Sequence, residues 1–356
     1  MSVTRILDHN DIAHIVAQVG PDDFMRELIS ELRKAFALWS TDEYDVPART
    51  GFHYATPVPG LIEWMPLHHR QSAVFQKAVG YHPQNPGRNR LPTVVATFVQ
   101  FDQQTGELIT VADGGLLTAM RTGAASAVAT EALRDLSGPI SLGLIGCGAQ
   151  AVTQLHAILQ VAQISEIRIF DTDQDAHESF AQRVQAFAAA VPVIESSPCG
   201  IAANSDVLCT ATSVDVGQGP VMEDCATRTG LHVNAIGSDF PGKIELPLSL
   251  LKRSLVIPDF PEQAAVEGEC QQLEPSERGP SLMKVMGDPQ QLANAKQATT
   301  VFDSTGWALE DYISLKVARQ YADEMRIGRQ IELSVSHGHP RNPYAAVLTP
   351  ALTGVK

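Results

Sequence analysis

The fold of this chain is decided by SLGLIGCGAQAVTQLHA, residues 141–157. A short apolar segment leads directly into Gly146, Gly148 and Ala151, a G-x-G-x-x-A pattern that opens an amphipathic helical stretch. In such a turn the first glycine permits the sharp bend, the second lets the backbone approach a pyrophosphate, and the small third residue lets helix and strand pack closely. The helix N-terminus adds free N–H groups for the phosphates. The stretch therefore predicts a dinucleotide-binding strand–turn–helix unit.

Asp171 supplies the second feature of this predicted site. It closes the next apolar segment, IRIFD, where a carboxylate can accept hydrogen bonds from the adenosine ribose hydroxyls and repels a 2′-phosphate. The alternative interpretation is a glycine-rich turn followed by a surface aspartate. Because strand, glycines, helix and acid occur in the expected order, we predict that the cofactor is NAD.

Short apolar segments alternate with helical stretches over residues 140–260. Val, Ile and Leu dominate these segments, and such strands separated by amphipathic helices are typical of a parallel sheet covered on both faces. The predicted strands are 141–146, 166–170, 191–194, 206–210, 231–237 and 254–258. We therefore predict an α/β fold in which residues 129–311 form a doubly wound, Rossmann-type NAD-binding domain.

The first part of the chain has a different pattern. A helix is predicted over residues 21–38, and the extended segments LIEWMP, AVFQKAV and TVVATFVQFD follow it. A further helix is expected over 307–325, with Gly328 as its C-cap. We expect the tail to return to the first part, so that residues 1–128 together with 312–356 form a separate α+β domain.

The composition is that of a globular protein with more than one core. A length of 356 residues fits two domains of about 150 residues each, and 44% hydrophobic against 19% charged residues excludes extended disorder. The net charge of −14 repels phosphate backbones and anionic membrane surfaces, and no basic stripe compensates for it. We expect neither a nucleic-acid nor a membrane partner.

The apolar runs, the first segment and the spacing of the cysteines bear on location and metal binding. No apolar run approaches the ~20 residues of a membrane-spanning helix, and the first segment, MSVTRILDHNDIAHIV, is too polar for a signal peptide. The five cysteines are widely spaced, without a CxxC or Cys/His cluster. We predict a cytoplasmic protein with no metal site and no disulfide framework.

Several long and unusual motifs extend over nearly the whole chain. They include PVPGLIEWMP, KAVGYHPQNPGRNRLPT, DGGLLTAMRTGAASAVA, ATSVDVGQGPV, VNAIGSDFPGKIELP, PEQAAVEGECQQL and VFDSTGWALED. On these motifs the chain resembles the ornithine cyclodeaminase/μ-crystallin family, and most closely its members that make pipecolate from lysine. The resemblance implies an NAD-dependent enzyme of basic amino-acid metabolism. It also implies a homodimer in which the substrate-binding first domains pair.

The resemblance assigns five residues to the substrate. Arg49 and Lys77 match family positions that hold the substrate α-carboxylate, and Arg121 matches one that contacts both carboxylate and cofactor. Asp239 matches the proton donor and acceptor of the family, and Glu63 lies in the motif of the substrate pocket. In addition, Glu63 is suited to steer the distal ammonium of a diamino acid or to move protons during ring closure.

The resemblance also assigns the cofactor contacts and one specificity position. Thr305 stands where the ornithine enzymes typically have valine, which favours a site not tuned strictly to ornithine. The residues that match family NAD contacts, beside the two glycines of the turn and Arg121, are Thr93, Ala149, Gln150, Asp171, Thr212, Val233, Asn234, Ala235 and Ile236.

These assignments agree with the chemistry of the residue types. Arginine offers a bidentate fork to a carboxylate and lysine adds a compact charge. Because hydride leaves Cα only from a neutral amine, a carboxylate base such as Asp239 is needed near the nitrogen. Without the motifs, Arg49 and Lys77 would be read as surface charges and Asp239 as a turn residue.

The resemblance implies a redox-neutral cyclodeamination. Hydride passes from Cα of L-lysine to NAD⁺, the distal amine attacks the resulting imine, ammonia leaves, and hydride returns to give L-pipecolate. The same scaffold allows L-ornithine to L-proline. Two further alternatives are a net ketimine reductase or amino-acid dehydrogenase, and a binding protein without catalysis, as some relatives are.

Overall fold

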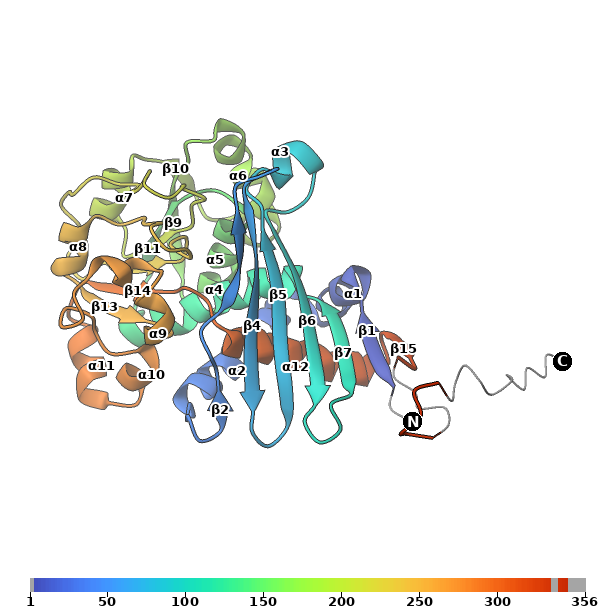
Figure 1. The fold of residues 1–356 in the computed structure, drawn as a ribbon. Coiled ribbons are helices and arrows are strands. Elements are labelled where there is room, and N and C mark those ends of the chain that lie inside the picture. The colour runs from blue at the N-terminus through green and yellow to red at the C-terminus, as the bar shows by residue number, and fades with distance from the viewer. Residues whose placement is uncertain (1–2, 334–338, 345–356) are drawn as a thin grey trace.

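The chain folds around two β-sheets that lie side by side (Figure 1). The computed structural model describes residues 3–333 and 339–344. The first sheet has the strand order β15-β1-β7-β6-β5-β4-β2, with β3 paired to β4. Its strands are β1 (Thr4–Leu7), β2 (Tyr44–Asp45), β3 (Thr50–Tyr54), β4 (Gly60–His69), β5 (Ala73–Tyr81), β6 (Val94–Asp102), β7 (Leu108–Asp113) and β15 (Arg329–Ile331).

Alternation of side chains gives the first sheet one buried and one exposed face. Along β4, for example, Leu61, Glu63 and Met65 are buried while Ile62 is exposed. Because successive side chains of a strand point to opposite faces, the odd-numbered residues of β4 and β5 point inward. Glu63 and Lys77 are therefore on the inner face, where the site described below lies.

Long helices cover the inner face of this sheet. Helices α4 (Gly115–Leu133) and α12 (Ala308–Met325) pack on the strands, and α2 (Pro21–Ala37) packs on both helices (Figure 1). The predicted helices over 21–38 and 307–325 are thus confirmed. The remaining helix of this half is α1 (His9–Val19), and a short one, α3 (Asn85–Asn89), joins β5 to β6.

The second sheet is parallel throughout, with the order β10-β9-β8-β11-β12-β14-β13. Its strands are β8 (Ile140–Ile145), β9 (Ile164–Phe170), β10 (Val193–Glu195), β11 (Val207–Thr210), β12 (His232–Ala235), β13 (Leu255–Pro258) and β14 (Thr300–Asp303). Its helices are α5 (Ala149–Leu159), α6 (Gln174–Ala188), α7 (Pro198–Asn204), α8 (Leu248–Lys252), α9 (Pro261–Ala264), α10 (Leu282–Met286) and α11 (Pro289–Ala295), with a 3-10 turn η1 (Glu269–Gln272). The prediction of a doubly wound α/β fold is confirmed.

Strand β14 was missing from the predicted strands. It is the last strand of the second sheet in sequence, yet it inserts between β12 and β13. All four of its residues are buried. Only two of its four residues, Val301 and Phe302, are apolar, which leaves too little pattern to recognise it. Its position matters because the Thr305–Gly306 turn of the site follows it directly.

The chain then returns from the second sheet to the first. Helix α12 runs along the first sheet, and β15 pairs antiparallel with β1. The expected cap at Gly328 was wrong, because the C-cap of α12 is Arg326, which itself takes the left-handed conformation (φ 58°). The boundaries 1–128 with 312–356 and 129–311 stay a prediction, and residues 1–2, 334–338 and 345–356 of the first unit lie outside the described residues.

Two of the five cysteines form a disulfide that the sequence did not predict. Cys199 at the start of α7 is joined to Cys225 in the loop that precedes β12, while Cys147, Cys209 and Cys270 are buried free thiols. A single bridge in a chain of this size is no disulfide framework. Among the described helices, none is long and apolar enough to cross a membrane.

Candidate active site

The glycine turn between β8 and α5 has the geometry that a dinucleotide requires. Gly146 has φ +94°, and a Cβ there would lie 2.5 Å from the carbonyl oxygen of Ala211, so no other residue fits. Gly148 is the N-cap of α5, with no side-chain cap, and open space surrounds its α-carbon. A pyrophosphate can therefore reach the backbone and the free N–H groups at the start of the helix.

Asp171 lies beside this turn, as the sequence predicted. It follows β9, and its Oδ2 accepts the N–H of Cys147 at 2.6 Å while Oδ1 accepts the N–H of Asp173 at 2.8 Å. The carboxylate is therefore fixed next to the first helix turn, where an adenosine ribose would lie. Burial, with the charge of Asp171, raises the pKa of the Cys147 thiol to about 12. That thiol is accordingly no nucleophile.

Glu245 organises the carboxyl ends of β11 and β12. Its Oε1 accepts from the backbone N–H and the hydroxyl of Thr212 at 2.7 and 2.6 Å. Its Oε2 accepts from Thr210 at 2.6 Å and from the N–H of Gly237 at 2.8 Å. The carboxyl ends of parallel strands are where such sheets bind their ligands, so this buried carboxylate shapes the cofactor side of the cleft.

The remaining predicted cofactor residues occupy different surroundings. Ala149 and Gln150 begin α5, while Val233 and Ala235 lie in β12 and Ile236 follows it. Asn234 is fully buried, and its amide donates to Thr130 Oγ1 at 3.0 Å. Thr93 is half-buried before β6, and its carbonyl accepts the N–H of His82 at 2.8 Å. Their cofactor contacts stay a prediction.

Arg49 stands at the centre of the substrate side. It precedes β3, and its Nη2 donates to the carbonyl oxygens of Thr305 and Gly306, at 3.1 Å for the latter. Nη1 donates to Glu63 Oε2 at 3.3 Å, and Glu267 Oε1 lies 2.8 Å from Nη2. The side chain of Arg49 is only 10% exposed. One cation is thus surrounded by carbonyl and carboxylate oxygens from both halves of the chain.

Asp239 faces the same group from the loop after β12. Its Oδ1 accepts from Lys243 Nζ at 3.0 Å. The ring of the next residue, Phe240, lies 4.6 Å from the His53 ring, and His53 in turn contacts Glu63 at 3.0 Å. Residues Arg49, Glu63, Asp239 and Glu267 are called the Arg49 cluster below.

The charges in the Arg49 cluster shift one another's protonation. Burial raises the pKa of Glu267 to about 8, although Arg49 opposes the rise, and the charges of Asp239 and Glu63 add to it. Burial alone would lower the pKa of Arg49, but these carboxylates outweigh it and raise that pKa. Lys243 pairs with Asp239 and Arg49 pairs with Glu63 and Glu267, so three carboxylates face two cations, which suits a ligand that carries an ammonium group.

Lys77 and Arg121 meet on α12, in a buried network with Glu310 and Asp311. Lys77 Nζ donates to both oxygens of Asp311 at 3.1 Å, and Arg121 Nε donates to Asp311 Oδ1 at 2.9 Å. Arg121 Nη1 donates to Glu310 Oε2 at 2.7 Å. Burial lowers the pKa of Lys77 to about 8 against the effect of Asp311. These four residues are called the α12 ion-pair network.

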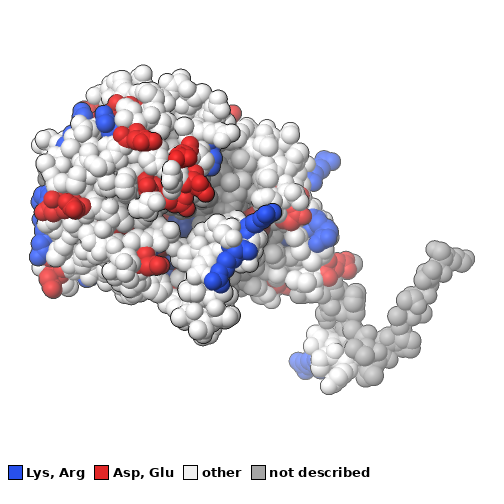
Figure 2. All heavy atoms as spheres, turned by 90° about the horizontal axis from the view of Figure 1, so that it is seen from above, with Lys and Arg blue, Asp and Glu red and all other residues white. Residues whose placement is uncertain are grey.

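The Thr305–Gly306 turn connects the network to the Arg49 cluster. Its carbonyls hold Arg49, and a Cβ at Gly306 (φ +72°) would collide with the guanidinium of Arg121. The hydroxyl of Thr305 donates to Asp259 Oδ1 at 3.0 Å and accepts from Gln263 Nε2 at 2.7 Å. The structure therefore brings the six predicted substrate residues to one region. On the face of the molecule drawn in Figure 2, Asp and Glu side chains gather beside a hollow.

Comparison with known proteins agrees with this geometry. The model of the ornithine cyclodeaminase/mu-crystallin family matches residues 9–326. The chain belongs to this family. It is 43% identical over 345 residues to the L-lysine cyclodeaminase of Streptomyces rapamycinicus, covering 96% of this chain and 99% of that protein.

Two solved structures are similar to this chain over most of their length. A lysine cyclodeaminase, described as recognising L-lysine, L-ornithine and L-2,4-diaminobutyric acid, has a TM-score of 0.92 at 45% identity, covering 97% of this chain and 99% of that one. A dimeric archaeal alanine dehydrogenase with bound NAD has a TM-score of 0.81 at 27% identity, covering 93% and 100%.

Sequence reasoning missed four acidic residues of this family member's site. Glu267, Glu310 and Asp311 contact the predicted cations, and Asp259 holds the Thr305–Gly306 turn. Glu267 and the Glu310–Asp311 pair lie inside quoted motifs, PEQAAVEGECQQL and VFDSTGWALED, which was the available signal. Within the described part of the chain, no group of three or more His, Cys, Asp or Glu side chains is placed to hold a metal ion.

Proposed function

We propose that this chain is an NAD-dependent cyclodeaminase that converts L-lysine to L-pipecolate and ammonia. The observation that carries the proposal is the Arg49 cluster, where three carboxylates face one guanidinium whose Nε has no hydrogen-bond partner among the described residues. A diamino acid carries one carboxylate and two ammonium groups, so its charges complement that arrangement. The 43% identity to a lysine cyclodeaminase supports the same substrate.

The residues of the glycine turn fit NAD. The open α-carbon of Gly148, the uncapped start of α5 and the fixed carboxylate of Asp171 provide the pyrophosphate and ribose contacts. NAD bound there would supply the hydride acceptor for the substrate Cα and the hydride donor for the cyclised product. The protein's own task is to position the substrate and to handle its protons.

The substrate-side residues take distinct roles in this proposal. Arg49 binds the α-carboxylate, and Lys77 and Arg121 add positive charge from the α12 ion-pair network. Asp239, which is partly exposed and held by Lys243, accepts a proton from the α-ammonium and returns one to the product nitrogen. Glu63 keeps Arg49 oriented, because both of its oxygens have partners, Arg49 and His53.

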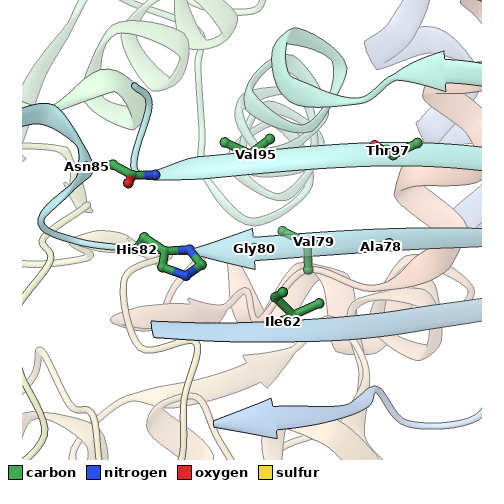
Figure 3. A pocket seen from close by; sticks show the side chains of 8 residues that line it. All are labelled: Ile62, Ala78, Val79, Gly80, His82, Asn85, Val95 and Thr97. Carbon is green, nitrogen blue, oxygen red and sulfur yellow. The ribbon is translucent and has the colours of Figure 1, made fainter. Parts of the chain in front are cut away.

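We also propose a homodimer that forms through the outer face of the first sheet. Ile62 and Val95 are 40% and 47% exposed there, and with Ala78, Gly80 and Thr97 they line a hollow of about 380 Å³ (Figure 3). Contiguous apolar surface on a sheet face favours association. The substitution Ile62→Asp is expected to give monomers in light scattering, and an unchanged mass would contradict this surface. A cytoplasmic location stays a prediction from the sequence.

One product assay tests the function. Wild-type protein with catalytic NAD⁺ and L-lysine is expected to give L-pipecolate without net NADH, and D239N is expected to lose about 10²–10⁴-fold in turnover while still binding NAD. Equal or faster turnover of L-ornithine would replace lysine by ornithine as the substrate. Sustained NADH formation in step with product would indicate a net oxidoreductase instead. No turnover of any amino or imino acid would indicate a binding protein.

A further inference from the structure

Glu267 is a buried carboxylate that no hydrogen-bond donor serves. It is 4% exposed, and its Oε1 has no hydrogen-bond partner among the described residues. Arg49 Nη2 lies 2.8 Å from that oxygen, but this nitrogen already donates to the carbonyls of Thr305 and Gly306. A guanidinium nitrogen of this kind has two hydrogens, so Glu267 receives charge from Arg49 without an aligned hydrogen bond.

The neighbouring carboxylates, in contrast, have hydrogen-bond donors. Glu63 is engaged at both oxygens, by Arg49 Nη1 and by His53 Nε2. Asp239 accepts from Lys243 Nζ. A buried carboxylate without a donor costs free energy unless a partner or a proton reaches it. In this cluster Glu267 is therefore the carboxylate prepared to accept a donor from a ligand.

The proposed cyclodeamination requires two proton acceptors. A diamino acid arrives with an α-ammonium and a side-chain ammonium, because unperturbed amines of this kind are protonated at neutral pH. The α-nitrogen must lose a proton before hydride leaves Cα, and the side-chain nitrogen must lose one before its lone pair can attack. Asp239 accounts for the first proton only.

We propose that Glu267 binds the side-chain ammonium of the diamino-acid substrate and accepts the proton that this nitrogen loses before ring closure. This inference rests on the proposed function and adds the residue that selects for a second amine. It assigns to Glu267 the role for which the sequence pattern had suggested Glu63.

With these two carboxylates, the protons of the substrate and of the products balance. Asp239 takes a proton from the α-ammonium and Glu267 takes one from the side-chain ammonium. The side-chain nitrogen then forms its bond to Cα, a proton passes from this nitrogen to the former α-nitrogen, and the Cα–nitrogen bond breaks to release NH₃. After hydride returns to Cα, Asp239 protonates the ring nitrogen and Glu267 protonates ammonia. L-lysine cation thus gives pipecolate zwitterion and NH₄⁺, and both carboxylates are restored.

The groups that face Glu267 favour this use. Arg49, Glu63, Asp239 and Asp259 all act on its charge, and with burial the balance raises its pKa to about 8. A base whose pKa lies near the working pH is efficient in proton transfer. An approaching ammonium lowers that pKa, since an opposite charge favours the ionised carboxylate, and so prepares Glu267 to bind the group from which it takes the proton.

The test compares E267Q with E262Q, an exposed glutamate of the same segment. Two ligands are used: L-lysine, and L-norleucine, which lacks the side-chain nitrogen. We expect E267Q to lose at least about 10²-fold in kcat/KM for lysine, while calorimetric binding of norleucine to the NAD⁺-loaded enzyme changes less than about threefold. The acid limb of the kcat–pH profile is expected to disappear in E267Q, and E262Q should match wild type throughout.

Several outcomes would overturn the assignment. Equal loss of norleucine binding would mean that Glu267 acts only by holding Arg49, and unchanged lysine turnover would mean that it has no role. If E267Q does not fold, E267D takes its place, and normal norleucine binding with slower lysine turnover is expected. If wild type makes no pipecolate, the proposed function fails. The ammonium site is then judged by binding alone, through tighter binding of lysine than norleucine that E267Q abolishes.

Discussion

The α12 ion-pair network and the Arg49 cluster both reach the Thr305–Gly306 turn, yet their charges are satisfied in different ways. In the network, two cations meet two carboxylates, and every charged group makes at least one aligned hydrogen bond, although Glu310 Oε1 has no partner among the described residues. In the Arg49 cluster one guanidinium meets three carboxylates, and Glu267 has no donor.

This difference separates a structural role from a ligand-binding one. Buried charges that satisfy one another hold the fold, because removing one partner leaves an uncompensated charge. A cluster with an excess of one sign and an acceptor in need of a donor is unfavourable until a complementary ligand arrives. The comparison makes four predictions.

Asp311→Asn is expected to have the largest effect on stability. It removes the carboxylate that serves both Lys77 and Arg121, and breaking a buried pair in this way costs about 3–5 kcal/mol in the free energy of unfolding. Urea denaturation measures the loss. The control is Asp323→Asn on the same helix, whose exposed pair with Arg5 should matter by about 0–1 kcal/mol. Similar losses in the two variants would break the comparison.

Arg49→Met is expected to cost less stability but to abolish substrate binding. The carbonyls of Thr305 and Gly306 lose their donor, whereas Glu63 keeps His53 and buried carboxylates can take up a proton instead. We expect a loss of about 1–3 kcal/mol in the free energy of unfolding, together with loss of amino-acid binding in calorimetry. Arg33→Met, at an exposed pair with Glu131, is the matched control. A larger loss than in D311N would reverse the order.

The pH dependence of stability should reveal Glu267. Its pKa is raised from 4.5 to about 8 in the folded protein, so between these values the folded state binds a proton that the unfolded state does not. The free energy of unfolding therefore falls as pH rises from 5 to 8. E267Q cannot titrate, and we expect a flatter slope and a relative gain of about 1–2 kcal/mol at pH 8.

Glu310 and Asp303, whose pKa values burial raises to about 8 and about 7, remain in both proteins of this pH experiment. The difference between wild type and E267Q thus isolates Glu267. Identical slopes in the two proteins would show that Glu267 is charged throughout this range in the folded state.

Thr305→Val is expected to have the smallest effect. The hydroxyl serves Asp259 and Gln263 rather than pointing at either charge cluster. Its loss should cost about 1 kcal/mol in the free energy of unfolding and change the ratio of kcat/KM for lysine over ornithine by less than about tenfold. A larger change would show that Thr305 contacts the substrate directly.

The local part of the fold could be predicted from the sequence, and the pairing of distant residues could not. Gly146, Gly148 and Asp171 lie within one strand–helix–strand unit, so their order alone indicates their geometry. The place of strand β14 between β12 and β13, both earlier in the chain, could not be predicted from the order of the segments.

The candidate site was predicted only in part, for the same reason. Motifs identified the cations Arg49, Lys77 and Arg121, but their partners are Glu267, Asp311 and Glu310, about 190 to 235 positions away along the chain. Spacing says nothing about contacts of such separation. The αL conformation at Arg326, where glycine was expected at 328, likewise depends on how the chain turns back toward β1 rather than on local preference.

The Thr305–Gly306 turn, finally, positions two arginines relative to each other. The Arg49 guanidinium donates to the carbonyls of the turn, and the Arg121 guanidinium packs against the α-carbon of Gly306. The turn therefore lies between the two guanidinium groups. Any chemical group inserted there, even a methyl, would push the two apart. The two guanidinium groups would then no longer be placed to bind one substrate carboxylate, although neither arginine had changed.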